Sequence, residues 1–312
     1  MILTIILLVV GFVCLIKGAD FFVDGSSRLA LKFRVPSLII GMTIVAMGTS
    51  APECAVSISA SLSGSNEMAI ANVVGSNMFN LLIVCGICAV IAPMAVNKAT
   101  LKKDFPFSSV MGLVLLGLGA WGMGVSRLDG IIFLVLFVIL LLNMISSAKK
   151  QQTEPDFTDD VPVSFSWVRV ILSIGGGLVA IVLGGQLVVN SAETIAESLG
   201  LSENLIGLTV CAIGTSLPEL VTSIVAARKG EVDMAMGNVI GSNIFNILFV
   251  LGLASTISPV GMIMENVIDL IILTVISLMM LLMAIPKKRL NRPCGLICII
   301  VYIIYMVYIC MR

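Results

Sequence analysis

Two stretches of the sequence place a glutamate inside an otherwise apolar run: GTSAPE ends at Glu53 and GTSLPE ends at Glu219. A charged side chain deep in a bilayer costs at least about 2.5 kcal/mol on insertion scales, so each carboxylate needs a partner. No lysine or arginine lies at a matching depth in these runs. A structural salt bridge, or a pair of protonated structural glutamates, is therefore a weaker interpretation than a bound cation.

The residues before each glutamate supply further oxygen atoms. Helical spacings of three and four residues place four residues on one face: Ala46, Thr49, Ser50 and Glu53. Pro52 lacks an N–H and clashes with the carbonyl four residues back, so a kink that bares main-chain oxygens is expected there, and Pro218 predicts the same in the second stretch. Ligand sets made only of oxygen suit Ca²⁺ or Na⁺ and not zinc or copper.

A second polar motif follows each glutamate, GSNMFN from Gly75 and GSNIFN from Gly241. In it, a serine and an asparagine lie one helical turn apart, as Ser76 and Asn80 and again as Ser242 and Asn246. An amide in an apolar environment needs a partner, which favours both asparagines as ligands. The neighbouring Asn77 and Asn243 are interpreted as supporting the helix breaks, and the two glycines as points of close helix approach.

The elements that must position these residues are membrane spans. Of the 312 residues, 59% are hydrophobic and only 12% are charged, and the mean hydropathy is +1.15, which excludes an ordinary soluble domain. Apolar runs long enough to cross a bilayer occupy 1–23, 37–61, 68–93, 105–124, 127–146, 164–190, 203–227, 232–257, 266–285 and 295–311. The first run lacks a basic start and a cleavage site, so it is predicted to be a span and not a signal peptide.

Several chemistries are disfavoured by composition. The chain has no histidine, which removes the commonest general base and zinc ligand. The pair Cys85 and Cys88 is interpreted as two small apolar residues in a span, against the alternative of a redox or metal site. Lysine plus arginine and aspartate plus glutamate both number 18, so no nucleic-acid partner is indicated.

An internal repeat organises the chain. Residues 41–86 align with 207–252 without a gap, at an offset of 166, and 24 of the 46 positions are identical. The duplication predicts a first five-helix repeat over 1–148, a cytoplasmic linker over 149–163 and a second repeat over 164–312. Because five is odd, the second copy enters the membrane from the opposite side. The predicted fold is an all-α integral membrane protein with about ten transmembrane helices in two inverted five-helix repeats.

The basic residues predict the orientation. With the N-terminus outside, 16 of the 18 lysines and arginines fall on the inner side, so both termini are predicted to be extracytoplasmic. The linker carboxylates Glu154, Asp156, Asp159 and Asp160 match no calcium loop, which favours a solvated linker over a regulatory cation site. Asp20 and Asp24 are expected to snorkel or to pair locally, beside Lys17.

The paired motifs resemble the alpha-repeats of the sodium/calcium exchanger family, within the cation/Ca²⁺ antiporter superfamily. This resemblance implies a short prokaryotic-type antiporter whose second, third, seventh and eighth spans form the ion site. Glu53 and Glu219 would then bind both Ca²⁺ and Na⁺, and Asn80 and Asn246 match the family's central polar pair. The flanking Na⁺ sites would be built by hydroxyls and two main-chain carbonyls, from Thr49, Ser50, Ser76, Thr215, Ser216, Ser242, Ala46 and Ala212.

The resemblance also implies a mode of coupling. The GTSxPE motif favours the sodium branch over proton/calcium exchangers, and potassium-dependent relatives carry aspartate at the position of Asn246. We therefore expect a non-enzymatic Na⁺/Ca²⁺ antiporter of the inner or plasma membrane that needs no cofactor and no K⁺. H⁺/Ca²⁺ exchange and K⁺-dependent Na⁺/Ca²⁺ exchange are the alternatives. From other classes, a cation channel and an intramembrane hydrolase with paired carboxylates are weaker candidates.

Overall fold

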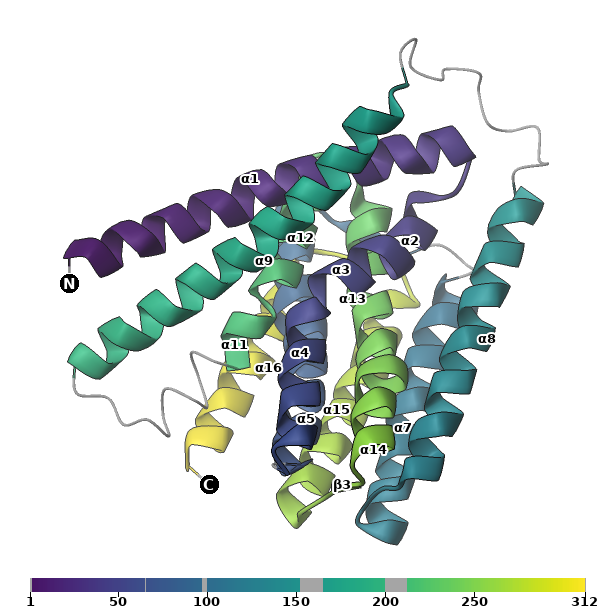
Figure 1. The fold of residues 1–312 in the computed structure, drawn as a ribbon. Coiled ribbons are helices and arrows are strands. Elements are labelled where there is room, and N and C mark those ends of the chain that lie inside the picture. Colours follow the sequence, from purple (N-terminus) through teal and green to yellow (C-terminus); the bar gives the residue numbers. More distant parts are fainter. Residues whose placement is uncertain (1, 65, 97–99, 152–164, 200–211, 312) are drawn as a thin grey trace.

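The computed structural model describes residues 2–64, 66–96, 100–151, 165–199 and 212–311, and they are almost entirely helical (Figure 1). Several spans are built from shorter helices joined by π-helical turns, labelled η. The first half contains α1 (Ile2–Phe33), α2 (Ser37–Ile40), η1 (Gly41–Val45), α3 (Ala46–Thr49), α4 (Ala51–Leu62), α5 (Asn66–Phe79), η2 (Asn80–Val84), α6 (Cys85–Ile91), η3 (Thr100–Asp104), α7 (Phe105–Gly122) and α8 (Arg127–Gln151). The second half contains α9 (Trp167–Ser198), α11 (Ala212–Thr215), α12 (Leu217–Arg228), α13 (Val232–Phe245), η5 (Asn246–Leu251), α14 (Gly252–Ile257), α15 (Met264–Ala284) and α16 (Arg292–Met311).

Seven helices among the described residues are long and apolar enough to cross a membrane. An eighth candidate is the broken pair Ser37–Thr49 and Ala51–Leu62, which bends by 48°. The first part of the predicted span 203–227 and most of the predicted linker lie outside the described residues, although α8 runs on to Gln151. The chain is therefore a multi-pass helical membrane protein, and the count of ten spans stays a prediction.

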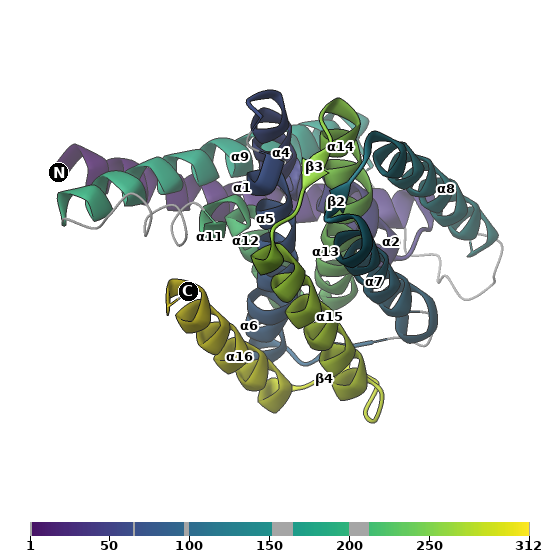
Figure 2. The same ribbon diagram turned by 90° about the horizontal axis from the view of Figure 1, so that it is seen from below.

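Burial separates the central helices from the peripheral ones. In the apolar windows of Met68–Ile91 and Val232–Ile257, 72% and 78% of the residues are buried, against 22% in α1 and 17% in α16. The GSNMFN and GSNIFN motifs lie in these central segments, with α7, α8, α15 and α16 on one side of them and α1 and α9 on the other (Figure 2). Most side chains of these two segments therefore contact protein and not lipid.

The helices α1 and α9 form a long antiparallel pair that crosses one side of the bundle (Figures 1 and 2). A Cβ atom at Gly18 would lie 2.8 Å from the carbonyl oxygen of Gly177, and one at Gly11 would lie 2.9 Å from that of Gly184. As the residue number rises along α1, the number of its contact residue in α9 falls, so the two helices are antiparallel. Only glycine allows backbones to approach so closely, as is common between membrane helices.

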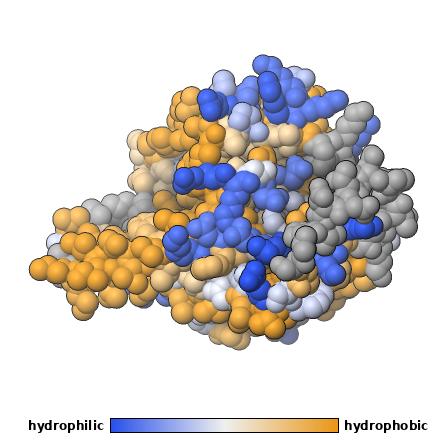
Figure 3. All heavy atoms as spheres, turned by 90° about the horizontal axis from the view of Figure 1, so that it is seen from above, coloured by the Kyte–Doolittle hydropathy of each residue, from blue (hydrophilic) through white to orange (hydrophobic). Residues whose placement is uncertain are grey.

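Two short antiparallel strand pairs tie the loops at the ends of the bundle. Strand β1 (Met94–Ala95) pairs with β4 (Arg289–Leu290), and β2 (Gly124–Val125) pairs with β3 (Val260–Gly261). On the face at the top of Figure 1, hydrophilic residues gather in the middle, whereas the arm that projects to one side is hydrophobic (Figure 3). This distribution fits a protein whose flanks contact lipid and whose end contacts water.

Candidate functional site

Both GTSxPE segments break their helices at the serine. Ser50 has φ −82° and ψ 11° between α3 and α4, and Ser216 has φ −92° and ψ 6° between α11 and α12. A proline occupies the first turn of each following helix, where its missing N–H removes no helical bond. The kink predicted from Pro52 is confirmed by the 48° bend, and the chain is also broken at the matching position before Pro218.

The two breaks face each other, so that each serine binds the glutamate of the other half of the chain. Ser50 donates a hydrogen bond from Oγ to Glu219 Oε1 at 2.7 Å. Ser216 donates from Oγ to Glu53 Oε1 at 2.8 Å. Ser76 also donates to Glu53 Oε1, at 3.4 Å, and lies 3.1 Å from the Ser216 hydroxyl. Five residues proposed from the sequence thus form one cluster.

This cluster contains more acceptor oxygens than the described donors can satisfy. Both glutamates are fully buried, and among the described residues neither Glu53 Oε2 nor Glu219 Oε2 has a hydrogen-bond partner. No ion pair of either carboxylate with a described lysine or arginine is present. Buried polar atoms in folded proteins are nearly always satisfied, so these carboxylate oxygens are candidate ligands for a cation.

Four asparagines form a reciprocal network beside the glutamates. Asn80 Nδ2 donates to Asn243 Oδ1 at 3.1 Å, and Asn246 Nδ2 donates to Asn77 Oδ1 at 3.1 Å. Asn77 and Asn243 also donate to each other's main-chain oxygens, at 3.3 and 3.4 Å. Two further buried acceptors, the Oδ1 atoms of Asn80 and Asn246, have no partner among the described residues. Asn243 therefore orients the amide of Asn80, and Asn77 orients the amide of Asn246, each from the other half of the chain.

Asn80 and Asn246 also begin the two central π-helical turns. Turn η2 starts at Asn80, and turn η5 starts at Asn246. Such turns are rare and occur frequently at functional sites, because the extra residue redirects backbone and side chains. The sequence repeat thus reproduces an irregular backbone feature as well as a side chain.

The remaining predicted residues differ in their surroundings. Thr49 is fully buried, and three acceptors lie within reach of its one hydroxyl hydrogen: the carbonyl oxygens of Val45 and Ala46, at 3.1 and 3.4 Å, and Asn238 Oδ1, at 3.1 Å. The Ala46 oxygen also accepts from the Ser50 main chain. The hydroxyls of Thr215 and Ser242 are buried without a partner among the described residues. Ala212 begins α11 at the edge of the described range.

Sequence reasoning missed two asparagines that hold the glutamate segments. Asn72 Nδ2 donates to the Glu53 carbonyl at 3.1 Å, and Asn238 Nδ2 donates to the Glu219 carbonyl at 3.4 Å. Each also binds a serine on the following turn, Ser57 or Ser223, at 2.9 Å. The signal was available, because each asparagine and each serine is retained at an offset of 166.

The predicted close approach at the motif glycines is confirmed for one of them. A Cβ at Gly241 would lie 2.5 Å from Met42 Cα, so α13 packs directly on η1. No described atom lies within 4 Å of a Cβ at Gly75. The residue that matches Met42 in the second half is Leu208, which lies outside the described residues.

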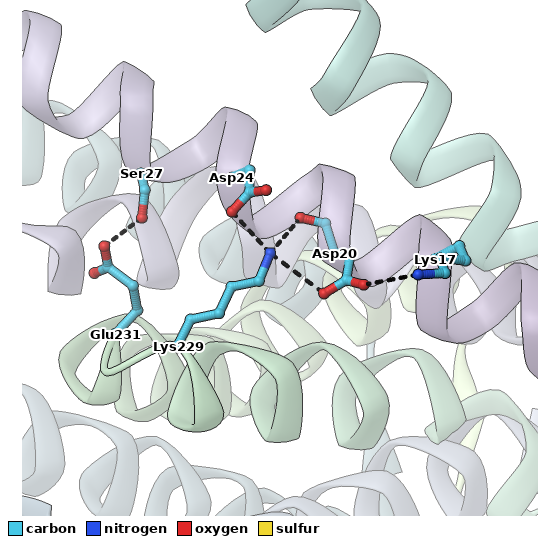
Figure 4. Close-up of polar contacts among 6 residues, drawn as sticks. All are labelled: Lys17, Asp20, Asp24, Ser27, Lys229 and Glu231. Atoms are coloured by element: carbon cyan, nitrogen blue, oxygen red, sulfur yellow. Dashed lines mark hydrogen bonds and ion pairs between the residues drawn. The ribbon is translucent and has the colours of Figure 1, made fainter. Parts of the chain in front are cut away.

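Asp20 and Asp24 pair with a residue that is distant in sequence (Figure 4). Lys229 Nζ lies 2.7 Å from Asp24 Oδ1 and 3.3 Å from Asp20 Oδ1. The expected local partner, Lys17, lies 3.8 Å from Asp20. Ser27 donates to Glu231 in the same cluster. Local pairing is thus confirmed for Asp20, while the shortest contact attaches α1 to the turn between α12 and α13.

Chemically, the central site is a cage of buried oxygen atoms from the two glutamates and their serine, threonine and asparagine neighbours. It offers carboxylate, hydroxyl, amide and carbonyl oxygens, the ligand types that hard cations such as Ca²⁺ and Na⁺ prefer. The glutamates lie at helix breaks buried within protein, the setting in which irregular backbone is tolerated at membrane depth.

Comparisons with known proteins agree with this geometry. The family model described as sodium/calcium exchanger protein matches residues 3–146 and 169–311. The chain is 39% identical to the putative antiporter CaxA of Alkalimonas amylolytica, with 98% of each chain covered, and 30% identical to the sodium/calcium exchanger MaX1 of Methanosarcina acetivorans, with 97% of each covered. A solved structure of the sodium-calcium exchanger NCX_Mj superposes with a TM-score of 0.86 at 32% identity, over 98% of each chain. The chain therefore belongs to the sodium/calcium exchanger family and is a cation/Ca²⁺ exchanger of the membrane.

Proposed function

We propose that this protein exchanges Na⁺ for Ca²⁺ across the membrane, and that Glu53 and Glu219 bind both ions in turn. One observation carries the proposal: four fully buried acceptor oxygens of the cage, two from carboxylates and two from amides, have no partner among the described residues. One Ca²⁺ would neutralise the two carboxylates, and so would two Na⁺. An empty cage would leave two uncompensated charges in a low-dielectric site, which discourages a crossing without ions and so enforces coupling.

The flanking ligands follow from the same geometry. Ser50, Ser216 and Ser76 surround the two carboxylates, and Asn80 and Asn246 each have an amide oxygen without a partner in the described part of the chain. Completing the proposed ligand set are Thr49, Thr215, Ser242 and the carbonyl groups of Ala46 and Ala212. The names of the relatives MaX1 and NCX_Mj support Na⁺ as the counter-ion.

We further propose that the chain consists of two inverted repeats, over 1–148 and 164–312. The packing of α1 on α9 supports this, because the two helices hold the matched glycines Gly18 and Gly184 and run in opposite directions. Two hydrogen bonds support it as well, because the offset of 166 residues converts the Asn80–Asn243 bond into the Asn246–Asn77 bond. Alternating access between the repeats is the transport mode that such an architecture favours.

We propose an orientation with both termini outside, based on the distribution of basic residues. In a variant without native cysteines, a cysteine at Glu265 should react with an impermeant thiol reagent from outside. A cysteine at Lys288 should react only after permeabilisation. The reverse pattern would invert the orientation.

The function is tested by ⁴⁵Ca²⁺ uptake into proteoliposomes with outward gradients of Na⁺, K⁺ or protons imposed one at a time. We expect uptake to follow the Na⁺ gradient alone. Uptake that a proton gradient drives without Na⁺ would replace this proposal with H⁺/Ca²⁺ exchange. A steady single-channel current would instead indicate a channel.

A further inference from the structure

Several hydrogen bonds around the cage are paired between the two halves, but Ser76 and its match Ser242 differ, and so do the Thr–Asn contacts beside the glutamates. Asn238 Oδ1 accepts a hydrogen bond from Thr49 Oγ1 at 3.1 Å. The matching residues are Asn72 and Thr215, and no hydrogen bond joins them. Thr215 Oγ1 has no partner at all among the described residues. The same four residue types therefore form a bond on one side of the cage and leave it open on the other.

Burial follows the same asymmetry. Thr49 and Asn238 are fully buried, whereas Asn72 and Thr215 are each only partly buried. The Thr–Asn pair that makes the bond is thus the more buried of the two pairs.

The bond has a direct connection to the ion ligands. Asn238 uses its amide nitrogen to hold the Glu219 carbonyl and its amide oxygen to hold Thr49 in α3. It therefore joins the glutamate helix of one half to the broken helix of the other. Asn72 holds the Glu53 carbonyl in the same way, and no hydrogen bond from a described residue to its side-chain oxygen is present.

We propose that Asn72 and Asn238 are positioning residues whose side-chain oxygens bind the two threonines alternately during transport. In the conformation described here the Thr49–Asn238 bond is closed and the Thr215–Asn72 bond is open; in the opposite conformation the roles are exchanged. Because the two bonds join the same chemical groups, their exchange changes the energy little, as a carrier with two accessible states requires. This inference rests on the proposed alternating access.

The test removes one hydroxyl at a time with Thr49→Val and Thr215→Val, and uses Thr→Ser at each position as the control that keeps the hydroxyl. Hydrogen–deuterium exchange of the purified protein in choline, without Na⁺ or Ca²⁺, reports on residues 41–49 and 212–220. Thr49→Val should raise exchange in 41–49 and lower it in 212–220, and Thr215→Val should do the reverse. Loss of one hydrogen bond, about 1 kcal/mol, corresponds to a shift of about fivefold in the conformational equilibrium.

The two asparagines supply an independent check. Asn238→Ala should shift exchange in the direction of Thr49→Val, and Asn72→Ala in the direction of Thr215→Val. Adding Thr49→Val to Asn238→Ala should produce little further change, because the bond is already lost. Shifts of the same sign from both threonine variants, no shift from Thr49→Val, or Thr→Ser behaving like Thr→Val would each overturn the inference.

A transport measurement separates this inference from the proposed function. Thr49→Val should disfavour the conformation described here. In oriented vesicles, the half-saturating Ca²⁺ concentration should therefore rise on the membrane face to which this conformation opens the cage and fall on the opposite face, and Thr215→Val should do the opposite. A residue that only binds ions would weaken both sides alike, which would contradict the exchange of bonds and leave Na⁺/Ca²⁺ antiport intact. If the wild type moves no Ca²⁺, the proposed function fails, while the hydrogen-exchange result still decides the bond exchange.

Discussion

Ser50 Oγ donates to Glu219 Oε1 over 2.7 Å, so a serine of the first half holds a glutamate of the second. The reciprocal bond from Ser216 to Glu53 completes the exchange at 2.8 Å. Neither half can therefore form the cage alone. The site exists only where the two broken helices meet.

Removal of either serine hydroxyl should weaken Ca²⁺ exchange. Ser50→Ala and Ser216→Ala each delete a hydrogen bond to a charged group, a contribution of about 1.5–3 kcal/mol, or roughly 10- to 150-fold in apparent affinity. The measurement is the half-saturating Ca²⁺ concentration for ⁴⁵Ca²⁺ uptake. Ser63→Ala is the matched control, because within the described part of the chain the Ser63 hydroxyl bonds the carbonyl oxygens of Ser59 and Ala60, in the helix that Ser63 caps, and no cage residue. An unchanged affinity in both site variants would contradict the assigned cage.

Neutralising either carboxylate should abolish Ca²⁺ exchange without unfolding the protein. Glu53→Gln and Glu219→Gln keep the shape of the side chain and remove half of the negative charge that faces a dication. In a water-poor site this change should reduce affinity more than about a thousandfold. Uptake of ⁴⁵Ca²⁺ measures the loss, and size-exclusion chromatography checks folding. Near-normal uptake by either variant would show that these residues do not bind the ion.

Ca²⁺ exchange should not require K⁺. Glu53 and Glu219 are the two acidic residues of the cage, and position 246 supplies an amide dipole instead of a third negative charge. K⁺ bound beside Ca²⁺ would leave the cage with an excess positive charge that a neutral oxygen offsets poorly. The measurement is Na⁺-driven Ca²⁺ flux with all K⁺ replaced by choline. Flux that vanishes and then returns when K⁺ is restored on the Ca²⁺ side would show this charge count to be wrong.

Many residues of the cage could be predicted from the sequence, because the motifs that supply them occur once in each half of the chain. The duplicated GTSxPE and GSN motifs identified Glu53, Glu219, Asn80 and Asn246, and the prolines predicted the helix breaks. The crossing of Ser50 to Glu219 could not be predicted, because it depends on how the two halves dock. The roles of Asn72 and Asn238 were missed although the repeat retains both residues, because their contacts to the glutamates are with main-chain carbonyls on another helix, and the repeat shows which residues are retained but not what they contact.

The ion pairs that attach α1 should contribute little to stability. Side chains of Lys229 and Asp24 are 29% and 56% exposed, and exposed pairs contribute about 0–1 kcal/mol. A double-mutant cycle with Lys229→Ala and Asp24→Ala should give a coupling free energy below about 1 kcal/mol, which decreases with added salt. Lys17→Ala is the control, because Lys17 is 69% exposed and 3.8 Å from its partner. A coupling of several kcal/mol, insensitive to salt, would show that this cluster is effectively desolvated.

The packing of α1 against α9 should depend on glycine at one position and not at its neighbour. A Cβ at Gly177 would lie 2.7 Å from the Phe22 main-chain nitrogen and 2.8 Å from the Gly18 carbonyl oxygen, so backbone must move to admit it. At Gly176, one residue earlier in the same helix, no described atom lies within 4 Å of a Cβ. Gly177→Ala should therefore destabilise the protein by about 1–3 kcal/mol through overpacking. Gly176→Ala should be neutral or stabilise it by up to about 1 kcal/mol, because alanine favours the helix.

Thermal unfolding of the two variants in the same detergent makes this comparison directly, since both add the same methyl group to the same helix. We expect the midpoint of Gly177→Ala to fall below that of the wild type and the midpoint of Gly176→Ala to remain at or above it. If both midpoints fall equally, the effect comes from helix composition and not from the contact with α1. If neither falls, α1 and α9 can separate without loss of stability, and the close glycine contact does not hold them together.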